Sequence, residues 1–213
     1  MSTYFTSQFC KNKFEKFLDA IWPVRCIACD AISQTHIFCR HCEPSIQLAE
    51  ENALFWFTGA IQETITKAKF EPSESRARKL MSYIREIPPP LFFSKLDGIT
   101  FVPIHWRRRL KRGFDLSALF TLAFSKQLKL PIFDYLKNTR FDKPLTLSHS
   151  KIERQALTQN RYQLRKNTNT PKNILLLDDV MTTGATLESA KRVLETAGHR
   201  VKCFALAKTP LKI

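Results

Sequence analysis

The chain has 213 residues, of which 44% are hydrophobic and 25% are charged, so its composition is that of a globular protein and excludes a disordered or fibrous one. Lys and Arg number 34 against 19 Asp and Glu, and the formal charge of +15 favours polyanionic partners: nucleic acid, phosphorylated small molecules or an anionic membrane face. Apolar stretches fall short of the ~20 residues that cross a bilayer, and the N-terminal sequence lacks the basic start and apolar block of a secretory signal. We therefore expect a cytoplasmic protein.

The first predicted element is a helix over residues 1–22, which ends before Pro23. Its apolar residues recur at spacings of three and four: Phe14, Phe17, Leu18, Ile21 and Trp22. We expect this helix to pack on the body of the protein. Lysines on its other face leave open a second interpretation, in which the helix lies on a membrane surface or on a partner.

Residues 23–50 contain two cysteine pairs, with the pattern Cys26-x2-Cys29-x9-Cys39-x2-Cys42. Four thiolates in two tight pairs favour a closed, tetrahedral, structural zinc site in a reducing cytosol. A redox dithiol pair and unligated cysteines are the alternatives, and His36 and His41 lie close enough to be alternative ligands. Cys10 and Cys203 stand apart, and Cys203 belongs to an apolar run that we expect in the core.

Strands and helices alternate through the rest of the chain. Apolar and aromatic runs predict strands at residues 54–59, 99–102, 174–177 and 201–207. Helical spacing of apolar residues predicts helices at residues 60–70, 75–87, 114–130, 151–162 and 186–197, with a long polar loop at 139–150. This alternation predicts an α/β fold with a mostly parallel sheet flanked by helices on both faces.

The segment from Ile174 to Thr186 carries the strongest chemical signal. Asp178 and Asp179 follow an apolar strand at its C-terminal end, where open α/β sheets bind their ligands. The next loop leads directly into a helix and presents hydroxyls and N–H groups suited to a phosphate, from Thr182, Thr183, Gly184, Ala185 and Thr186. Acids beside a phosphate cradle predict a ligand with a phosphate and a polyol, such as a ribose 5-phosphate. The carboxylates would accept hydrogen bonds from the ribose hydroxyls or hold a divalent cation. The alternative is two acids that only cap a helix.

Five basic residues follow the strand predicted at 99–102: Arg107, Arg108, Arg109, Lys111 and Arg112. We expect them in a strand-end loop rather than on an exposed helix, near the same rim as the acids. Guanidinium groups bind phosphate oxygens in pairs, which suits a diphosphate or a DNA backbone, and Trp106 beside them can stack on a base. The alternative is a solvated basic face that only aids solubility.

Residues 174–186 resemble, at all thirteen positions, the phosphoribosyl-diphosphate motif of type I phosphoribosyltransferases. The resemblance implies that Asp178 and Asp179 contact the ribose hydroxyls. It also implies that residues 182–186 hold the 5-phosphate and that Mg²⁺ binds together with phosphoribosyl diphosphate.

Residues 101–114 resemble the Val-Pro-…-Arg-Gly-Phe block of the ComF competence family, which includes GntX-like proteins and in which this stretch forms the pyrophosphate loop. Pro103 thereby joins the five basic residues as candidates to contact pyrophosphate or DNA. The usual Asn-Gln continuation is replaced by Asp115-Leu116.

The family also carries a flap over its ligand. Here Arg140, Arg154, Asn160 and Tyr162 match that flap in part, and Leu157 stands where asparagine is common. The residues that could close over a pyrophosphate are Arg140, Lys143 and Lys151.

The resemblance spans about residues 22–208 and implies a type I phosphoribosyltransferase-like α/β fold preceded by a small four-cysteine zinc-finger module. It divides the chain into an N-terminal helix over 1–22, a zinc-binding module over 23–50 and a phosphoribosyltransferase-like domain over 51–213.

Three functions agree with this resemblance. In the first, a ComF-type protein of natural transformation binds phosphoribosyl diphosphate with Mg²⁺ and assists the uptake of incoming single-stranded DNA, with a helicase or DNA-processing factors as partners and a place in the cytoplasm or at the inner membrane face. In the second, a phosphoribosyltransferase of nucleobase salvage transfers ribose phosphate to a free base. In the third, a non-catalytic module senses the ligand and regulates a partner.

Overall fold

The computed structural model describes residues 24–33, 37–71, 73–90, 93, 95–139, 161–165, 170 and 172–210. The helix predicted over 1–22, the loop at 139–150 beyond Thr139 and the helix at 151–162 up to Asn160 lie outside the described residues. The prediction of a helix at 151–162 is wrong at its C-terminal end, because Tyr162 begins a strand.

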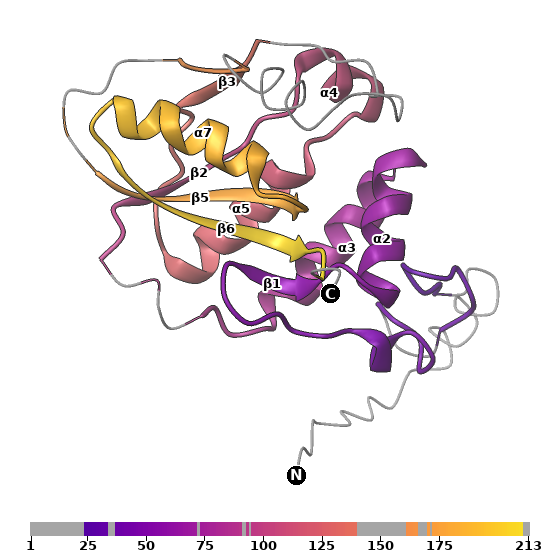
Figure 1. Ribbon diagram of the computed structural model, residues 1–213. Coiled ribbons are helices and arrows are strands. Elements are labelled where there is room, and N and C mark those ends of the chain that lie inside the picture. The colour runs from indigo at the N-terminus through magenta and orange to yellow at the C-terminus, as the bar shows by residue number, and fades with distance from the viewer. Residues whose placement is uncertain are drawn as a thin grey trace.

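A parallel four-stranded sheet forms the centre of the molecule (Figure 1). Its order is β1 (Ala53–Trp56), β6 (Arg200–Lys208), β5 (Asn173–Met181) and β2 (Gly98–Phe101), and each neighbouring pair is parallel. The strand predicted at 174–177 continues to Met181, so the two acids belong to the strand itself. The prediction of a mostly parallel sheet is confirmed.

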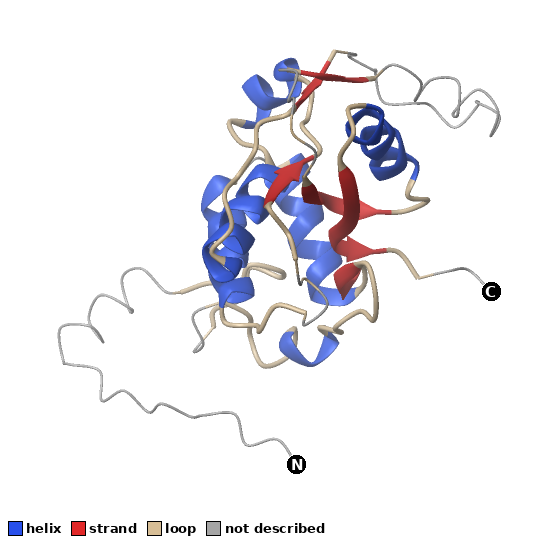
Figure 2. Ribbon diagram, turned by 90° about the vertical axis from the view of Figure 1, so that its left-hand side faces the viewer, coloured by secondary structure: helices blue, strands red, loops and turns tan. Residues whose placement is uncertain are grey.

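Helices cover both faces of this sheet (Figure 2). On one face pack α2 (Gly59–Phe70), α3 (Glu74–Arg85) and α5 (Leu116–Leu128), and on the other packs α7 (Ala185–Thr196). Strand side chains alternate between faces, so Leu175 and Leu177 join the first core, whereas Ile174 and Leu176 join the second. Because β5 is an inner strand buried on both faces, its position is fixed, and so is the position of the acids at its end.

The basic stretch forms a short helix, α4 (Trp106–Arg112), which corrects the prediction of a loop. His105 caps it, since its Nδ1 accepts a hydrogen bond from the Arg107 N–H at 3.2 Å. Gly113 ends it with φ +82, a conformation that glycine adopts without strain. Arg, Lys and Leu are good helix formers, and the cap and the glycine give their run both a start and a stop.

A small antiparallel pair lies beside the main sheet, made of β3 (Leu136–Asn138) and β4 (Tyr162–Leu164). The cysteine segment includes the 3-10 turn η1 (Glu43–Ser45) and packs under α2 and α3. Its Phe38 ring meets Tyr83 of α3 edge to face at 5.1 Å, so this module shares the main core. Among the described residues, no helix has both the length and the apolar character needed to cross a bilayer.

Candidate functional site

The acid pair lies at the carboxyl end of the central strand β5, where ligands bind in open α/β sheets. Asp178 is buried, and its Oδ1 accepts hydrogen bonds from Ser117 Oγ of α5 at 3.1 Å and from the Asp179 N–H at 2.8 Å. The Asp179 Oδ1 accepts a hydrogen bond from Lys69 Nζ of α2 at 2.8 Å. The two carboxylates are therefore held by different helices.

A cavity of about 180 Å³ opens beside the pair. Its acidic and basic lining residues are Lys69, Arg108, Arg112, Arg161, Asp178 and Asp179. Its remaining lining residues are Val102, Pro103, Ile104, His105, Asn138, Tyr162, Val180 and Thr186. Four cations and two carboxylates around one small cavity suit a ligand that is both polyanionic and rich in hydroxyl groups.

Burial dominates the protonation of the groups at this cavity. Desolvation, helped by the charge of Asp179, raises the pKa of Asp178 well above its usual range. Desolvation also raises the pKa of Tyr162 to about 12, so its phenol keeps the proton as a hydrogen-bond donor. The pKa of His105 is lowered by burial and by the neighbouring arginines, which leaves a neutral ring. Because its Nδ1 accepts the Arg107 N–H, its proton resides on Nε2.

The threonine loop joins β5 to α7. Gly184, at φ +76, is the N-cap residue of α7, and Thr183 Oγ1 accepts a hydrogen bond from the Ala185 N–H at 3.4 Å. Thr186 lines the cavity, whereas Thr182 and Thr183 are exposed beside it. The positive end of the α7 dipole lies here, so the loop has the backbone arrangement that anions favour.

The basic residues of α4 divide between the face that lines the cavity and the face exposed to solvent. Arg108 and Arg112, four residues apart on one side, line the cavity together with Pro103. Arg107, Arg109 and Lys111 are exposed outside it. The structure thus brings only two of the five predicted basic residues to the acids.

The exposed part of α4 also carries large apolar groups. Trp106 is 57% exposed and Leu110 is 74% exposed, one helical turn apart. The Arg107 guanidinium lies 5.2 Å from the centre of the Trp106 ring, a cation–π contact. Aromatic and cationic groups side by side at a protein surface are the elements of a single-strand nucleic-acid platform.

Comparisons with known proteins fit this architecture. Residues 116–212 match the model of the phosphoribosyl transferase domain. The competence protein ComFC of Bacillus subtilis (strain 168) is 25% identical over 209 residues, covering 94% of this chain and 82% of that protein. The competence protein ComFC of Streptococcus pneumoniae (strain ATCC BAA-255 / R6) is 24% identical, covering 93% of this chain and 86% of that protein. Over nearly its whole length this chain is similar to ComFC competence proteins, and it has a type I phosphoribosyltransferase-like fold.

Among solved structures, the ComFC-like chain is similar to orotate phosphoribosyltransferase from Aeropyrum pernix. The sequence identity is 14% and the TM-score 0.38, and the match covers 64% of this chain and 61% of that enzyme.

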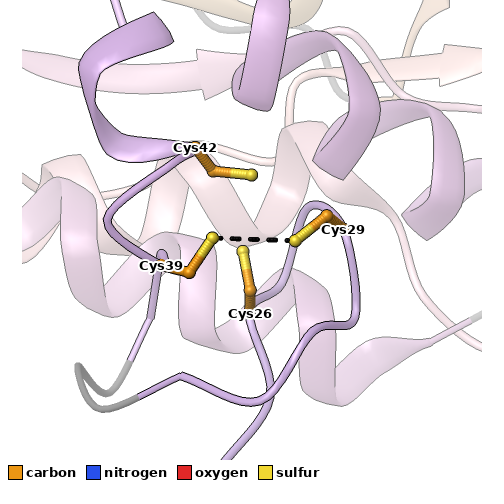
Figure 3. A group of neighbouring side chains, drawn as sticks. All are labelled: Cys26, Cys29, Cys39 and Cys42. Atoms are coloured by element: carbon orange, nitrogen blue, oxygen red, sulfur yellow. Dashed lines mark hydrogen bonds between the residues drawn. The ribbon is translucent and has the colours of Figure 1, made fainter.

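The four cysteines of the ComFC-like chain converge as their spacing predicts (Figure 3). Their Sγ atoms all lie within 4.8 Å of one another, and those of Cys29 and Cys39 are 3.7 Å apart. Sulfurs at about 2.3 Å from a tetrahedral zinc ion are about 3.8 Å from each other, so this donor set fits zinc. Hydrogen bonds from the backbone at Cys42 and His41 lower the pKa of Cys39 to about 7, whereas desolvation raises the pKa of Cys42, so Cys39 is the more readily ionised of the two thiols.

The first cysteine pair is tied to the helices by two cations. Lys67 Nζ of α2 donates to the Ala28 carbonyl and, at 2.9 Å, to Asp30 Oδ2. Arg76 of α3 donates to the Ile27 carbonyl and, at 2.8 Å, to Asp30 Oδ1. These contacts hold the turn between Cys26 and Cys29 against the ends of two helices.

The remaining cysteines and histidines have less bearing on a site. Within the described residues the metal-ligand group contains the four cysteines and no histidine, and His41 is exposed. Cys203 is half-buried on β6, where burial raises its pKa to about 11, and Cys10 and His36 lie outside the described residues. Of the flap residues, only Tyr162 is described, and it lines the cavity from β4.

The departure Asp115-Leu116 has a structural role. Asp115 is the buried N-cap of α5: its Oδ1 accepts hydrogen bonds from the N–H groups of Ser117 at 3.0 Å and Ala118 at 3.4 Å. Its Oδ2 accepts a hydrogen bond from the Ile104 N–H at 3.1 Å, which fixes the segment between β2 and α4. Leu116 is buried in the core. Asp115 therefore positions the rim of the cavity.

Three residues of this site were not among the predicted site residues. Lys69 reaches Asp179 across 110 residues of chain, and Ser117 reaches Asp178 across 61. Asn138 Nδ2 donates to the Pro103 carbonyl at 3.1 Å. Only the folded topology places them beside the acids.

Proposed function

We propose that this ComFC-like chain binds phosphoribosyl diphosphate with Mg²⁺ and assists the handling of incoming single-stranded DNA during natural transformation. The observation that carries the proposal is one cavity bounded by the acid pair, by the start of the threonine loop helix and by two arginines of α4. The competence role is inferred from the similarity to the two ComFC competence proteins.

Each group of lining residues matches one part of this ligand. Asp178 and Asp179 accept hydrogen bonds from the ribose hydroxyls, and residues 182–186 hold the 5-phosphate. Arg108 and Arg112 bind the diphosphate oxygens. Tyr162, which keeps its phenolic proton, supplies a further donor.

Carboxylate oxygens at the cavity fit the hard-oxygen preference of Mg²⁺, and Asp179, with a side chain only 13% exposed, would hold the ion together with ligand oxygens. When bound, Mg²⁺ supplies positive charge to the diphosphate and so stabilises it as a leaving group. The residues of this chain position the sugar and exclude water around it.

A zinc ion at Cys26, Cys29, Cys39 and Cys42 has a structural part in this proposal. All four protein donors are present, so the site is closed and leaves no position for a substrate. The ion would fix the turn that lies against α2 and α3.

Calorimetry of the full chain with phosphoribosyl diphosphate and Mg²⁺ tests the small-molecule part. We expect saturable binding by the wild type and at least a tenfold loss in D178N/D179N, because the charge of Asp179 and an acceptor oxygen of each acid are removed. Circular dichroism checks that the variant keeps its fold. Equal affinity of the two proteins would contradict the site.

A deletion strain tests the biological part. We expect loss of transformation with normal growth on nucleobases. Turnover with a free purine or pyrimidine would instead favour nucleobase salvage. Binding without turnover, together with ligand-dependent association with a protein partner, would favour a sensor.

A further inference from the structure

Lys69, which is distant in sequence from the acid pair, forms an ion pair with one of the two acids. It lies in the last turn of α2, and its Nζ is 2.8 Å from Asp179 Oδ1. The Lys69 side chain is 19% exposed and that of Asp179 is 13% exposed, so the pair is largely withdrawn from water. Both residues line the cavity.

The position of this ion pair conflicts with a purely structural role. Asp179 is one of two carboxylates that the proposed ligand needs, and in the ligand-free protein Lys69 already neutralises it. A lysine has three donors on a flexible four-carbon stem, so its ammonium can turn from one acceptor to another without movement of the backbone.

The backbone around Lys69 is fixed. Lys67, two residues earlier, is bonded to Ala28 and Asp30 in the cysteine module. The end of α2 is therefore held in place, and only the Lys69 side chain has to move when a ligand enters.

We propose that Lys69 is a ligand-contacting residue of this site: it neutralises Asp179 in the free protein, and on binding it leaves Asp179 to the ribose hydroxyls and the divalent cation and bonds to phosphate oxygens of the ligand. This inference rests on the proposed function and adds to it a residue that is not among the predicted site residues. Lys69 serves as the resident cation that the incoming Mg²⁺ replaces.

Two opposite effects follow from this role. Removing the ammonium takes one cation from the phosphates, so K69M should bind phosphoribosyl diphosphate with Mg²⁺ at least tenfold more weakly than the wild type. Removing it also leaves Asp179 without its partner, so K69M should bind Mg²⁺ alone more tightly than the wild type does. A general loss of structure would weaken both.

Calorimetry on the full chain measures both affinities. K69Q is a second variant, because its amide can still donate to Asp179 and so preserves the fold while lacking the charge. The control is K79M, which removes an exposed lysine of α3 and should bind like the wild type. Thermal unfolding confirms that each variant is folded.

The outcomes separate this role from the function on which it rests. A wild type that does not bind phosphoribosyl diphosphate overturns the proposed function, and the role of Lys69 with it. Binding by the wild type together with unchanged affinity of K69M and K69Q overturns the role of Lys69 alone. Unchanged Mg²⁺ affinity in K69M overturns its part as the resident cation. Weaker ligand binding with tighter Mg²⁺ binding supports the proposal.

Discussion

At the scale of single residues, Asp178 combines burial with a neighbouring like charge. Both effects raise its pKa, to about 8 from an ordinary value of 3.8. The Ser117 hydroxyl and the Asp179 N–H oppose the shift, because they stabilise the ionised form. The folded protein thus keeps a proton on Asp178 at a pH at which an unfolded chain has released it.

This difference predicts how stability depends on pH. Between pH ~4 and ~8 the unfolded chain binds fewer protons at this position than the folded one, so the Asp178 contribution to the free energy of unfolding falls as pH rises. D178N has no proton to lose, so its stability relative to the wild type should grow with pH, by up to about 1.4 kcal/mol per pH unit. Urea unfolding at several pH values measures it.

The control for this experiment is D134N, which removes an exposed carboxylate paired with Arg165. It should show no such growth with pH. A constant difference between D178N and the wild type across this range would contradict the buried, protonated state of Asp178.

At the scale of elements, α4 separates two kinds of basic side chain. Arg108 and Arg112 face the cavity, whereas Arg107, Arg109 and Lys111 face solvent. We expect R107Q/R109Q/K111Q to bind single-stranded DNA with a salt dependence weaker by up to about 2 in log–log slope, because each cation lost contributes about 0.7. Fluorescence anisotropy at several salt concentrations measures the slope.

The matched variant R108Q/R112Q should lose affinity for phosphoribosyl diphosphate with Mg²⁺, and the exposed-face variant should keep it. A slope identical to that of the wild type in R107Q/R109Q/K111Q would assign DNA binding to another surface of the molecule.

The predicted zinc site makes the stability of the cysteine module depend on metal binding. C26S/C29S should contain no zinc after purification and should unfold at a lower temperature, because a structural zinc ion contributes on the order of 10 kcal/mol to folding. Metal analysis by mass spectrometry and calorimetric unfolding measure the two effects. The control is C203S, which lies outside the cluster and should retain one zinc ion per chain. Absence of zinc from the purified wild type would contradict the site.

At the scale of the whole molecule, the sheet and its helices were accessible to sequence reasoning because local patterns encode them. The apolar run at residues 174–177 predicted the central strand, and the cysteine spacing predicted the convergence that the structure shows. The helix over residues 106–112 differs from the predicted loop, because its bounds depend on the cap at His105 and the stop at Gly113 rather than on an apolar periodicity.

Contacts between distant segments could not be predicted in this way. The pairing of Lys69 with Asp179 depends on α2 lying against the end of β5, and no periodicity or spacing in one sequence encodes that approach. Ser117 was hidden for the same reason, since its hydroxyl meets Asp178 only after α5 packs on the sheet.

The last turn of α2 connects the cysteine cluster to the acid pair. Lys67 binds the first cysteine turn and Lys69 binds the acid pair, with a single alanine between them. A chelator that loosens the cysteine turn would therefore weaken the contact between Lys67 and Asp30. That contact holds the end of α2, which carries Lys69. Metal status at one end of the chain is expected to tune sugar-phosphate affinity at the other, even though no cysteine touches that ligand.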